Sequence, residues 1–318
     1  MARKSFGIKY VECYRLYIMK IIELNKTNKK SHFTATIGIF DGLHKGHKKI
    51  LEELKQKEPN IVLTFYKHPR NIKTLQSLAE RLKTIKEIGI NKAVVFTNKD
   101  KIMDMAAVQF IENIVKNLNI ESLIVGSDSR MGRNRESGIK DLNEICKNNK
   151  IKLTVIDVIC DHGKKLSSTD IRDYVEHGNV PKAASMLGHS LELHGIVVKG
   201  KGNGEKLGFR TANIQINSLR TLPDHGIYIS RTHLDTATFP SVTFIGTSPT
   251  IHKDPVTIQN PLVETHIINF EKDLYGKKIH IELIEKIRDI KRFASLAELS
   301  NAIAKDVEQA VKRLHSYK

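Results

Sequence analysis

The fold of the first half of the chain is decided by one stretch, Gly38-Ile39-Phe40-Asp41-Gly42-Leu43-His44-Lys45-Gly46-His47. An apolar run with β-branched residues, 35–40, leads into it, and a helical pattern over 47–57 follows it. This order places the stretch at a turn between a buried strand and a helix. Turns at the carboxyl ends of parallel strands are where open α/β sheets bind ligands.

Strand-like and helix-like segments alternate on both sides of that turn. The expected strands are 35–40, 61–65, 93–96, 122–125 and 152–159, and the expected helices are 47–57, 78–88, 108–118 and 141–147. Short apolar strands separated by amphipathic helices are typical of a parallel sheet covered by helices. The first half is therefore predicted to be an α/β domain of Rossmann-like, doubly wound type.

The second half has a different pattern. Two short helices, 171–175 and 180–187, are followed by segments without helical periodicity, and the helical period returns only at 296–314. The strands expected between them are 193–198, 212–216, 226–232, 241–245, 262–268 and 278–287. Several short strands between Gly, Pro and Asp turns predict a small antiparallel β-barrel with a C-terminal helix. We expect a boundary near residue 185, with one domain over 19–185 and another over 186–318.

Composition narrows the functional class. Among 318 residues, 40% are hydrophobic and 27% charged, which excludes a mostly disordered chain. With 52 Lys and Arg against 35 Asp and Glu, the net charge is +17. Such a charge attracts nucleic acid, an anionic membrane surface or phosphorylated small molecules. The alternative at this point is that lysine is simply the favoured solubilising residue of the surface.

The cysteines and the apolar runs indicate the compartment. Cys13, Cys146 and Cys160 lie far apart and form no C-x-x-C pair, so a disulfide framework or a zinc site is not expected. No apolar run approaches the roughly 18 residues that a membrane-spanning helix needs. The first 22 residues mix charged and apolar side chains and lack the pattern of a signal peptide. We expect a cytoplasmic protein that binds neither membranes nor nucleic acid.

The residues of the quoted stretch suit a phosphate ligand. Gly42 and Gly46 allow the backbone to approach phosphates closely, and the helix start offers free N–H groups. His44 and His47 are three apart, so they face the same way on a first helical turn. Two imidazoles there can donate to phosphate oxygens as charge builds on a leaving pyrophosphate. The motif alone would also suit two surface histidines in a turn.

Two further segments should meet this turn. Residues 125–128 close one strand, and 167–172 follow another as an N-cap that opens a helix. The hydroxyls of that cap suit phosphate, and Arg172 offers a planar fork for the same anion. A Ser/Thr run is by itself usually only a cap, but beside the histidines it favours a phosphate site.

A second site is indicated in the barrel half. A glycine-rich loop over 200–209 can present N–H groups to phosphate, although such loops are often plain hairpins. Thr211 and Asn213 are two apart on a strand and share one face, and their oxygens suit Mg²⁺. Glu264 lies in an apolar strand, where it could accept the proton of an attacking hydroxyl or simply face solvent.

Four segments, 38–47, 64–69, 126–132 and 167–172, resemble the adenylyltransferase half of the bacterial bifunctional riboflavin kinase/FAD synthetases. The resemblance implies a Rossmann-like domain that joins FMN to the AMP part of ATP and releases pyrophosphate. It implies that His44 and His47 hold the ATP phosphates and that Arg172 stabilises the developing charge. The implied ATP-binding residues are Gly38, Phe40, Asp41, Gly42, Gly46, Gly126, Asp128, Ser167, Ser168 and Thr169, and the implied flavin-binding residues are His68 and Pro69. Lys67 and Met131 depart from the family, which usually has Pro and an aromatic there.

The segments 208–213, 263–266, 274–277 and 286–289 resemble the riboflavin kinase half of the same family. The resemblance implies that Thr211 and Asn213 bind Mg·ATP and that Glu264 activates the riboflavin 5′-hydroxyl. The implied phosphate-binding glycines are Gly200, Gly202, Gly204 and Gly208, and the implied flavin-binding residue is Arg288. Arg210 stands in place of the usual Pro, Phe244 in place of Asn, and Ile290 in place of Glu. Loss of the fixed φ of Pro predicts a looser turn before Thr211.

The combined prediction is an enzyme that makes FMN from riboflavin and ATP, and then FAD from FMN and ATP. Its expected ligands are ATP, Mg²⁺, riboflavin, FMN and FAD, and we expect a monomer or a weak homo-oligomer. One alternative, motivated by Arg210, is an FMN adenylyltransferase whose C-terminal domain only binds flavin. The other, a nucleic-acid-binding protein, is disfavoured because the basic residues are dispersed. Residues 1–18 lie outside the resemblance and are expected to be an extension or the result of an upstream start codon.

Overall fold

The computed structural model describes residues 19–21, 32–97, 102–157, 159–161, 164–200, 204, 207–235, 237–246 and 262–316. The chain divides into two compact units, Met1–Ser168 and Thr169–Lys318. The expected extension, 1–18, lies outside the described residues. The domain boundary that we expect near residue 185 stays a prediction.

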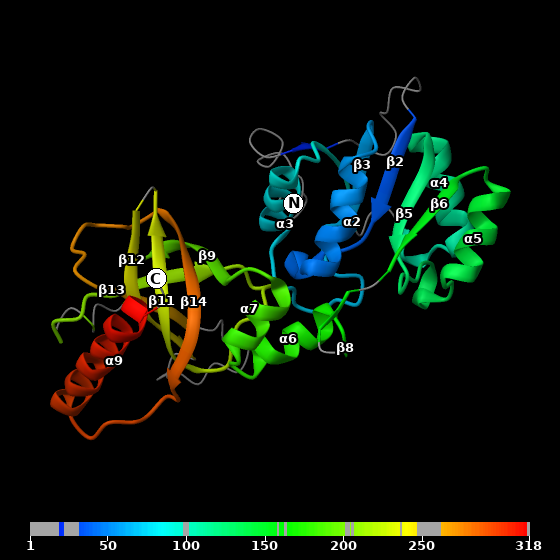
Figure 1. The fold of residues 1–318 in the computed structure, drawn as a ribbon. Coiled ribbons are helices and arrows are strands. Elements are labelled where there is room, and N and C mark those ends of the chain that lie inside the picture. The colour runs from blue at the N-terminus through cyan, green and yellow to red at the C-terminus, as the bar shows by residue number, and fades with distance from the viewer. Residues whose placement is uncertain are drawn as a thin grey trace, which may run out of the picture. The chain divides into compact units, whose positions relative to one another are not determined.

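A six-stranded sheet forms the first unit (Figure 1). Its strands are β1 (Lys20–Ile21), β2 (Phe33–Ile37), β3 (Asn60–Phe65), β4 (Lys92–Phe96), β5 (Ile120–Gly126) and β6 (Lys152–Ile156). They lie in the order β1-β4-β3-β2-β5-β6, and every neighbouring pair is parallel. The two-stranded sheet of β7 (Cys160–Asp161) and β8 (Lys164–Lys165) follows it.

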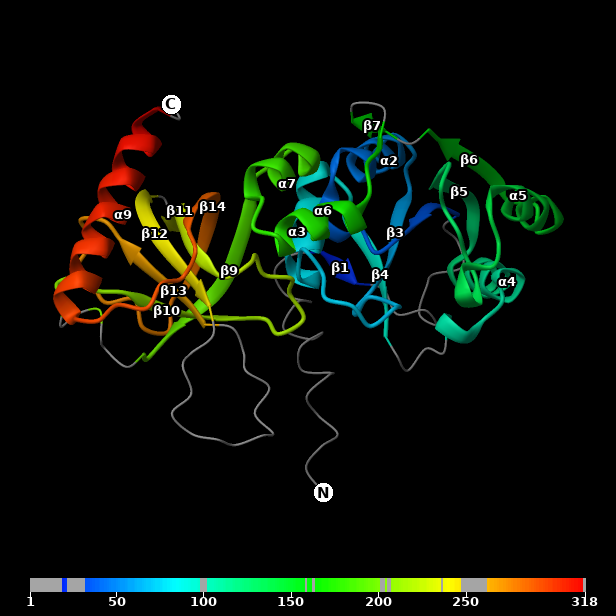
Figure 2. The same ribbon diagram turned by 90° about the horizontal axis from the view of Figure 1, so that it is seen from below.

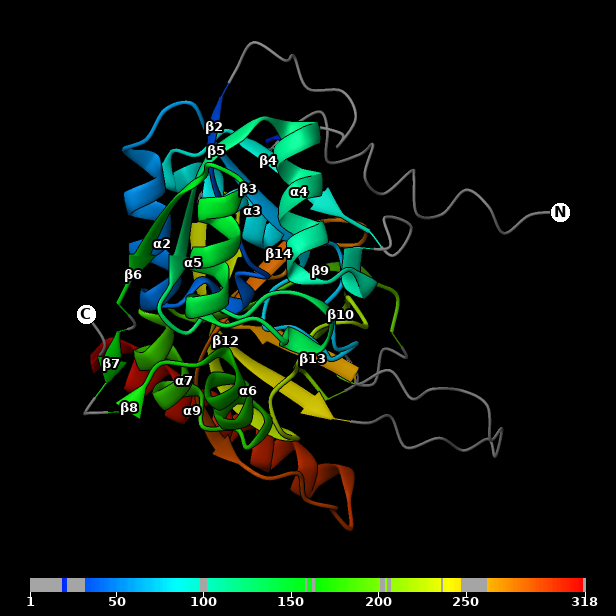
Figure 3. The ribbon, with the colours of Figure 1, turned by 90° about the vertical axis from the view of Figure 1, so that its right-hand side faces the viewer.

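Helices cover both faces of this sheet, which Figure 3 views from the side of α4 and α5. The helices are α2 (Lys45–Lys55), α3 (Leu78–Ile88), α4 (Ala107–Leu118) and α5 (Ile139–Asn148), with short 3-10 turns η1 (Asp41–Leu43), η3 (Ile102–Asp104) and η4 (Arg133–Arg135). Leu51 of α2 and Leu82 of α3 belong to one core, and Ile111 of α4 and Leu142 of α5 to the other. Apolar residues on one stripe of each helix thus bury both faces, and the predicted α/β fold is confirmed.

Element ends differ from the prediction where local geometry intervenes. The first expected strand, 35–40, stops at Ile37, because Phe40 has a left-handed backbone with a φ of 54°. Helix α2 begins at Lys45 rather than at 47, because the His44 side chain caps its N-terminus. The last expected strand of the sheet, 152–159, stops at Ile156.

The described chain after β8 forms two helices, a closed antiparallel barrel and a C-terminal helix. The helices α6 (Ser168–Glu176) and α7 (Val180–Leu187) precede the strands β9 (Leu191–Val198), β10 (Ala212–Ile216), β11 (Gly226–Leu234), β12 (Ala237–Gly246), β13 (Leu262–Ile267) and β14 (Lys278–Arg288). The barrel closes in the order β10-β13-β12-β11-β14-β9, and the predicted antiparallel barrel is confirmed. Closure leaves no unpaired edge strand in the barrel.

The C-terminal helix α9 (Leu296–Ser316) lies along the outside of this barrel (Figure 2). Its Ala310 is fully buried against Ile229 and Val242 of the strands. Ser295 caps the helix by accepting from the N–H of Glu298 at 3.2 Å, and the Glu298 carboxylate accepts from the N–H of Ala294 at 3.1 Å. Ser295 and Glu298 therefore cap the helix as a pair, with the return bond one residue earlier than in a standard capping box.

The barrel contains a buried hydroxyl network. Ser230 lies 2.8 Å from both Ser241 and Thr243, and Thr243 lies 3.0 Å from Thr265. All four side chains are fully buried. Since side chains alternate between the faces of a strand, Glu264 lies on the opposite face from Thr265. The network therefore fixes which face of β13 the carboxylate occupies.

Candidate active sites

The first candidate site lies where the order of the parallel sheet reverses. From β2 the chain proceeds to β3 and β4 on one side, and then returns to β5 and β6 on the other. The carboxyl ends of β2 and β5 are therefore adjacent, and such a switch point opens a crevice for ligands. The quoted loop, 38–47, follows β2 and Gly126 ends β5, so the two predicted segments lie side by side.

Three residues with a left-handed backbone conformation shape the loop 38–47. Phe40, Gly42 and Leu43 have φ values of 54°, 76° and 43°. The side chains of Phe40 and Leu43 are buried, which holds these strained conformations in place. A Cβ at Gly46 would lie 3.1 Å from the His44 ring, and one at Gly38 would lie 3.1 Å from the Phe40 ring. A side chain at either position would therefore force the neighbouring ring to shift by a few tenths of an ångström.

His44 and His47 form a stacked pair at the start of α2. Their ring centroids are 3.7 Å apart, with the planes inclined by 20°, and the backbone N–H of His47 points to His44 Nδ1 at 3.4 Å. Burial, the neighbouring His44 and then Arg81 lower the pKa of His47 well below its usual value, so His47 is neutral at pH 7. Its Nδ1 is buried and has no hydrogen-bond partner in the described structure. A buried polar atom without a partner is a natural place for a ligand contact.

Asp41 is a scaffold for this loop. Its buried carboxylate accepts from the backbone N–H groups of Leu75 at 2.7 Å and Gln76 at 3.2 Å. Its carbonyl accepts from the Ser168 hydroxyl at 3.0 Å. Lys165 lies 2.6 Å from Asp128, which follows β5. The Ser168 bond therefore brings the predicted segment 167–168 to the histidine loop, and the Lys165 ion pair links the chain just before that segment to Asp128.

The structure explains the position of some of the other predicted residues around this loop, and leaves the ATP contacts of others as predictions. A Cβ at Gly126 would lie 2.9 Å from the Asp128 carboxylate, so this glycine permits the turn after β5. Ser167 precedes α6 directly. Thr169 and Arg172 belong to the second unit, where Arg172 is buried, and their predicted contacts with ATP stay predictions.

The predicted flavin residues His68 and Pro69 line a cavity of about 250 Å³ at the ends of β3 and β4. Phe65, Phe96 and Met103 contribute apolar and aromatic surface. The polar lining comes from Lys67, Asn71 and Thr97. Aromatic side chains together with several polar groups can hold a ligand that has a flat apolar ring and polar edges. Lys67, one of the departures from the family, thus supplies a cation to this lining.

In the barrel, the predicted glycine loop contacts the predicted metal ligands. A Cβ at Gly200 would collide with the Asn213 amide, and one at Gly204 would lie 3.0 Å from the Thr211 hydroxyl. Gly208 has a φ of +78°, which only glycine adopts readily. Gly202 lies outside the described residues. Gly200 and Gly204 therefore lie directly against Asn213 and Thr211.

Glu264 faces the same site. It is the cross-strand partner of Asn213 on β10 and of Phe244 on β12. Opposed residues on paired strands point to the same face, so the half-buried carboxylate of Glu264 lies beside the amide of Asn213. Phe244 supplies an apolar neighbour where the family usually has Asn. A Cβ at Gly246 would meet both Phe244 and Ile290, so two of the departures lie together.

Arg210, the third departure in this half, is held by two polar contacts. Its guanidinium donates to the carbonyl of Glu271 at 2.8 Å, and its own carbonyl accepts from the His266 ring at 2.8 Å. The ring of Phe209 also packs edge-on against His266 at 5.5 Å. These contacts restrain the turn before Thr211 in place of the ring of a proline.

Arg288 was predicted to bind flavin, and its guanidinium is engaged by α9. It donates to both carboxylate oxygens of Asp306, at 2.9 and 2.7 Å. Phe293 lies 5.8 Å from the guanidinium. Asp306 was not predicted, because its partner is distant in sequence and a helical Asp usually faces solvent.

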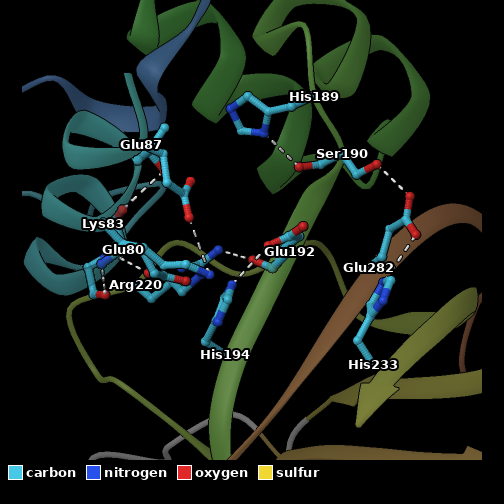
Figure 4. Close-up of polar contacts among 12 residues, drawn as sticks. Glu80, Lys83, Glu87, His189, Ser190, Glu192, His194, Arg220, His233 and Glu282 are labelled. Atoms are coloured by element: carbon cyan, nitrogen blue, oxygen red, sulfur yellow. Dashed lines mark hydrogen bonds and ion pairs between the residues drawn. The ribbon is translucent and has the colours of Figure 1, made fainter. Parts of the chain in front are cut away.

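The structure also reveals a row of histidines that the sequence pattern did not predict. His194, His280 and His233 are cross-strand neighbours on β9, β14 and β11, with ring centroids 5.0 and 4.2 Å apart. Glu192 lies beside His194 and Glu282 beside His233 (Figure 4). The nitrogen–oxygen distances of these two contacts are 2.9 and 3.4 Å. The bond from His194 lowers the pKa of Glu192 to about 2. Only the strand register brings these residues together.

The described part of the chain contains neither a cluster of metal-ligating side chains nor a membrane-spanning helix. Within it, no group of three or more His, Cys, Asp or Glu side chains could hold a metal ion. The Mg²⁺ that we expect would therefore depend on the oxygens of Thr211 and Asn213 and on those of the substrate phosphates. No helix among the described residues is both long and apolar enough to cross a membrane.

Comparison with known proteins identifies the family. A FAD synthetase family model matches residues 26–170, and a riboflavin kinase family model matches residues 187–314. The bifunctional riboflavin kinase/FMN adenylyltransferase of Escherichia coli K12 is 33% identical over 85% of this chain and 89% of that protein. This chain belongs to the bifunctional riboflavin kinase/FMN adenylyltransferase family. The family assignment confirms the predicted resemblance.

Other relatives agree with this assignment to the bifunctional riboflavin kinase/FMN adenylyltransferases. The Bacillus subtilis protein of that name is 28% identical over 87% of this chain and 90% of its own length. The Buchnera aphidicola protein is 31% identical over 92% and 96%. A solved structure described as a macrolide-efflux protein from Streptococcus pneumoniae matches 92% of this chain and 98% of its own, with a TM-score of 0.77 and 24% identity. That likeness supports the fold alone.

Proposed function

We propose that the chain phosphorylates riboflavin with ATP in the barrel unit and adenylylates the resulting FMN with a second ATP in the α/β unit. The products are FMN and ADP from the first reaction, and FAD and pyrophosphate from the second. The observation that carries this proposal is that one chain contains both enzyme domains and matches bifunctional relatives over about nine-tenths of their length.

In adenylyl transfer, a phosphate oxygen of FMN attacks the α-phosphorus of ATP. The bond from that phosphorus to the bridging oxygen breaks, and pyrophosphate leaves with the electron pair. His44 and His47 stand at the helix start, where N–H groups can stabilise the negative charge that develops. We assign Arg172 to the same charge, and Gly42, Gly46 and Gly126 to close approach of the backbone.

We assign the FMN ring to the cavity lined by His68 and Pro69. Its walls include Phe65 and Phe96, which can contact a flat ring on its apolar faces. The cavity begins at the end of β3, and the histidine loop follows the neighbouring strand β2. Flavin and ATP would therefore bind at adjacent strand ends.

In the kinase reaction, the riboflavin 5′-hydroxyl attacks the γ-phosphorus of ATP, and ADP leaves with the bridging oxygen. Glu264 is placed beside Asn213 and would accept the hydroxyl proton. The loop from Gly200 to Gly208 would cover the phosphates. Arg288, fixed by Asp306, would contact the flavin.

Thr211 and Asn213 would hold Mg²⁺ together with the ATP phosphates. Their hydroxyl and amide oxygens are hard ligands, and Gly200 and Gly204 pack closely against Asn213 and Thr211 without a side chain of their own. When bound, Mg²⁺ neutralises phosphate charge. We further propose that the enzyme works in the cytoplasm as a monomer or weak homo-oligomer, without nucleic-acid or membrane partners.

Product analysis tests the function. The pure protein is incubated with riboflavin and Mg·ATP, and the flavins are separated by chromatography. FMN followed by FAD is expected. FAD formed only from added FMN would instead support an adenylyltransferase with an inactive barrel, and no product from either flavin would contradict the proposal.

A further inference from the structure

Arg81 is a fully buried cation in the core of the first unit. It lies on α3 and is 1% exposed, yet Leu82 and Ile85 on the same helix are ordinary core residues. Burying a guanidinium is costly unless its N–H groups find acceptors. Burial lowers its pKa to about 10, so it is still charged at pH 7. Such a costly residue in an apolar core calls for a specific role.

The guanidinium of Arg81 connects two neighbouring strand ends. Nη1 donates to the carbonyl of Ile39, just after β2, and to the Thr64 hydroxyl on β3 at 3.1 Å. Nη2 donates to the carbonyl of Phe65 at 3.0 Å. Ile39 precedes the left-handed Phe40 of the histidine loop, and Phe65 lines the cavity assigned to flavin. One planar group therefore bonds to both substrate-binding segments.

We propose that Arg81 is a positioning residue for adenylyl transfer, whose planar fork fixes the histidine loop against the strand end that lines the flavin cavity. This inference rests on the proposed function of that site. Reacting groups must meet within a few tenths of an ångström, and a misplacement of about 1 Å can cost roughly 100-fold in rate. The role requires the shape of a guanidinium, since an ammonium cannot bond to both carbonyls in one plane.

The charge of Arg81 has a second consequence for the same loop. It disfavours a proton on His47, together with burial and the neighbouring His44. Asp41 and Glu80 face Arg81 with opposite charge, and both raise its pKa. Loss of the cation should therefore raise the pKa of His47, whereas a lysine at the same place should not.

The test compares R81K and R81M in the full-length chain, with K83M as the control. Lys83 lies on the same helix, but it is exposed and forms a surface ion pair with Glu87 at 3.8 Å. For FAD formation from FMN and ATP, R81K should lower kcat about 100-fold while leaving both KM values within a few-fold. R81M should also raise the His47 pKa in an NMR titration. K83M should match the unaltered protein in both measurements.

Each other outcome overturns the inference. An R81K variant with unchanged kcat would show that the fork is dispensable. Loss of the calorimetric transition of the first unit in R81K would show a purely structural role. Absence of FAD from the unaltered chain would instead contradict the proposed function, and with it this role. As a control for the barrel unit, the same R81K preparation should still form FMN from riboflavin.

Discussion

Arg288 on β14 and Asp306 on α9 form a bidentate ion pair, with nitrogen–oxygen distances of 2.9 and 2.7 Å. The Asp306 side chain is only 5% exposed, so its charge depends on this partner. The pair also holds the start of the 289–295 connection, which leads into α9. A residue assigned to flavin is thus oriented by the helix that covers the barrel.

Replacing Asp306 with Asn should destabilise the barrel unit by about 3 kcal/mol, because it leaves a largely buried guanidinium without its counter-charge. Calorimetry of the full chain measures this as a lower Tm of the barrel transition. The control is R313Q, which breaks the more exposed contact to Glu285 between the same two elements. That change should cost about 1 kcal/mol or less. Equal Tm shifts for the two variants would contradict this account.

Replacing Gly200 with Ala should abolish riboflavin phosphorylation, since the added Cβ would collide with the Asn213 amide. Conversion of added FMN to FAD should persist, because Gly200 lies in the barrel unit. G138A is a matched control, as Gly138 has open space around it and a φ of −92°. Unchanged FMN formation by G200A would show that the loop does not depend on this close approach.

Glu192 should make the barrel sensitive to acid. Its pKa is lowered to about 2 in the folded protein, chiefly by the bond from His194, and is near 4.5 when unperturbed. A lowered pKa gives stability that is present above pH 4.5 and is lost as the pH falls toward 2. E192Q should therefore reduce the loss of stability between pH 5 and about pH 3, measured as the Tm of the barrel transition. E308Q, on the exposed face of α9, should lose as much stability between pH 5 and about pH 3 as the unaltered protein. If E192Q also lost as much stability as the unaltered protein, the role assigned to Glu192 would be contradicted.

Local signals made much of the fold predictable. The bounds of α3 follow from the sequence because Ser77 and Glu80 form a capping box and Gly89 ends the helix in a left-handed conformation. The histidine loop was predictable because its glycines and histidines lie at a strand–helix turn. In the barrel, alternation and turn residues were sufficient to place six strands.

Contacts between distant residues were not predictable. Arg81 occupies a helix on which basic residues usually face solvent, and only the fold shows that it enters the core. The hydroxyls of Ser230 and Thr243 suggest an exposed strand face, yet they are buried because they bond to one another. The pairing of Arg288 with Asp306 likewise depends on where α9 packs. In each case the partner is set by tertiary structure rather than by sequence spacing.

The central claim is that two separate sites perform the two reactions, and paired variants test it most directly. H47A should lower FAD formation at least 100-fold while FMN accumulates from riboflavin, since it removes a donor to the developing charge. E264Q should block FMN formation and leave added FMN convertible to FAD. For each variant, FMN and FAD formation are both measured on one preparation by separating the flavins chromatographically. Loss of both activities in either variant, with both thermal transitions retained, would contradict the two-site account.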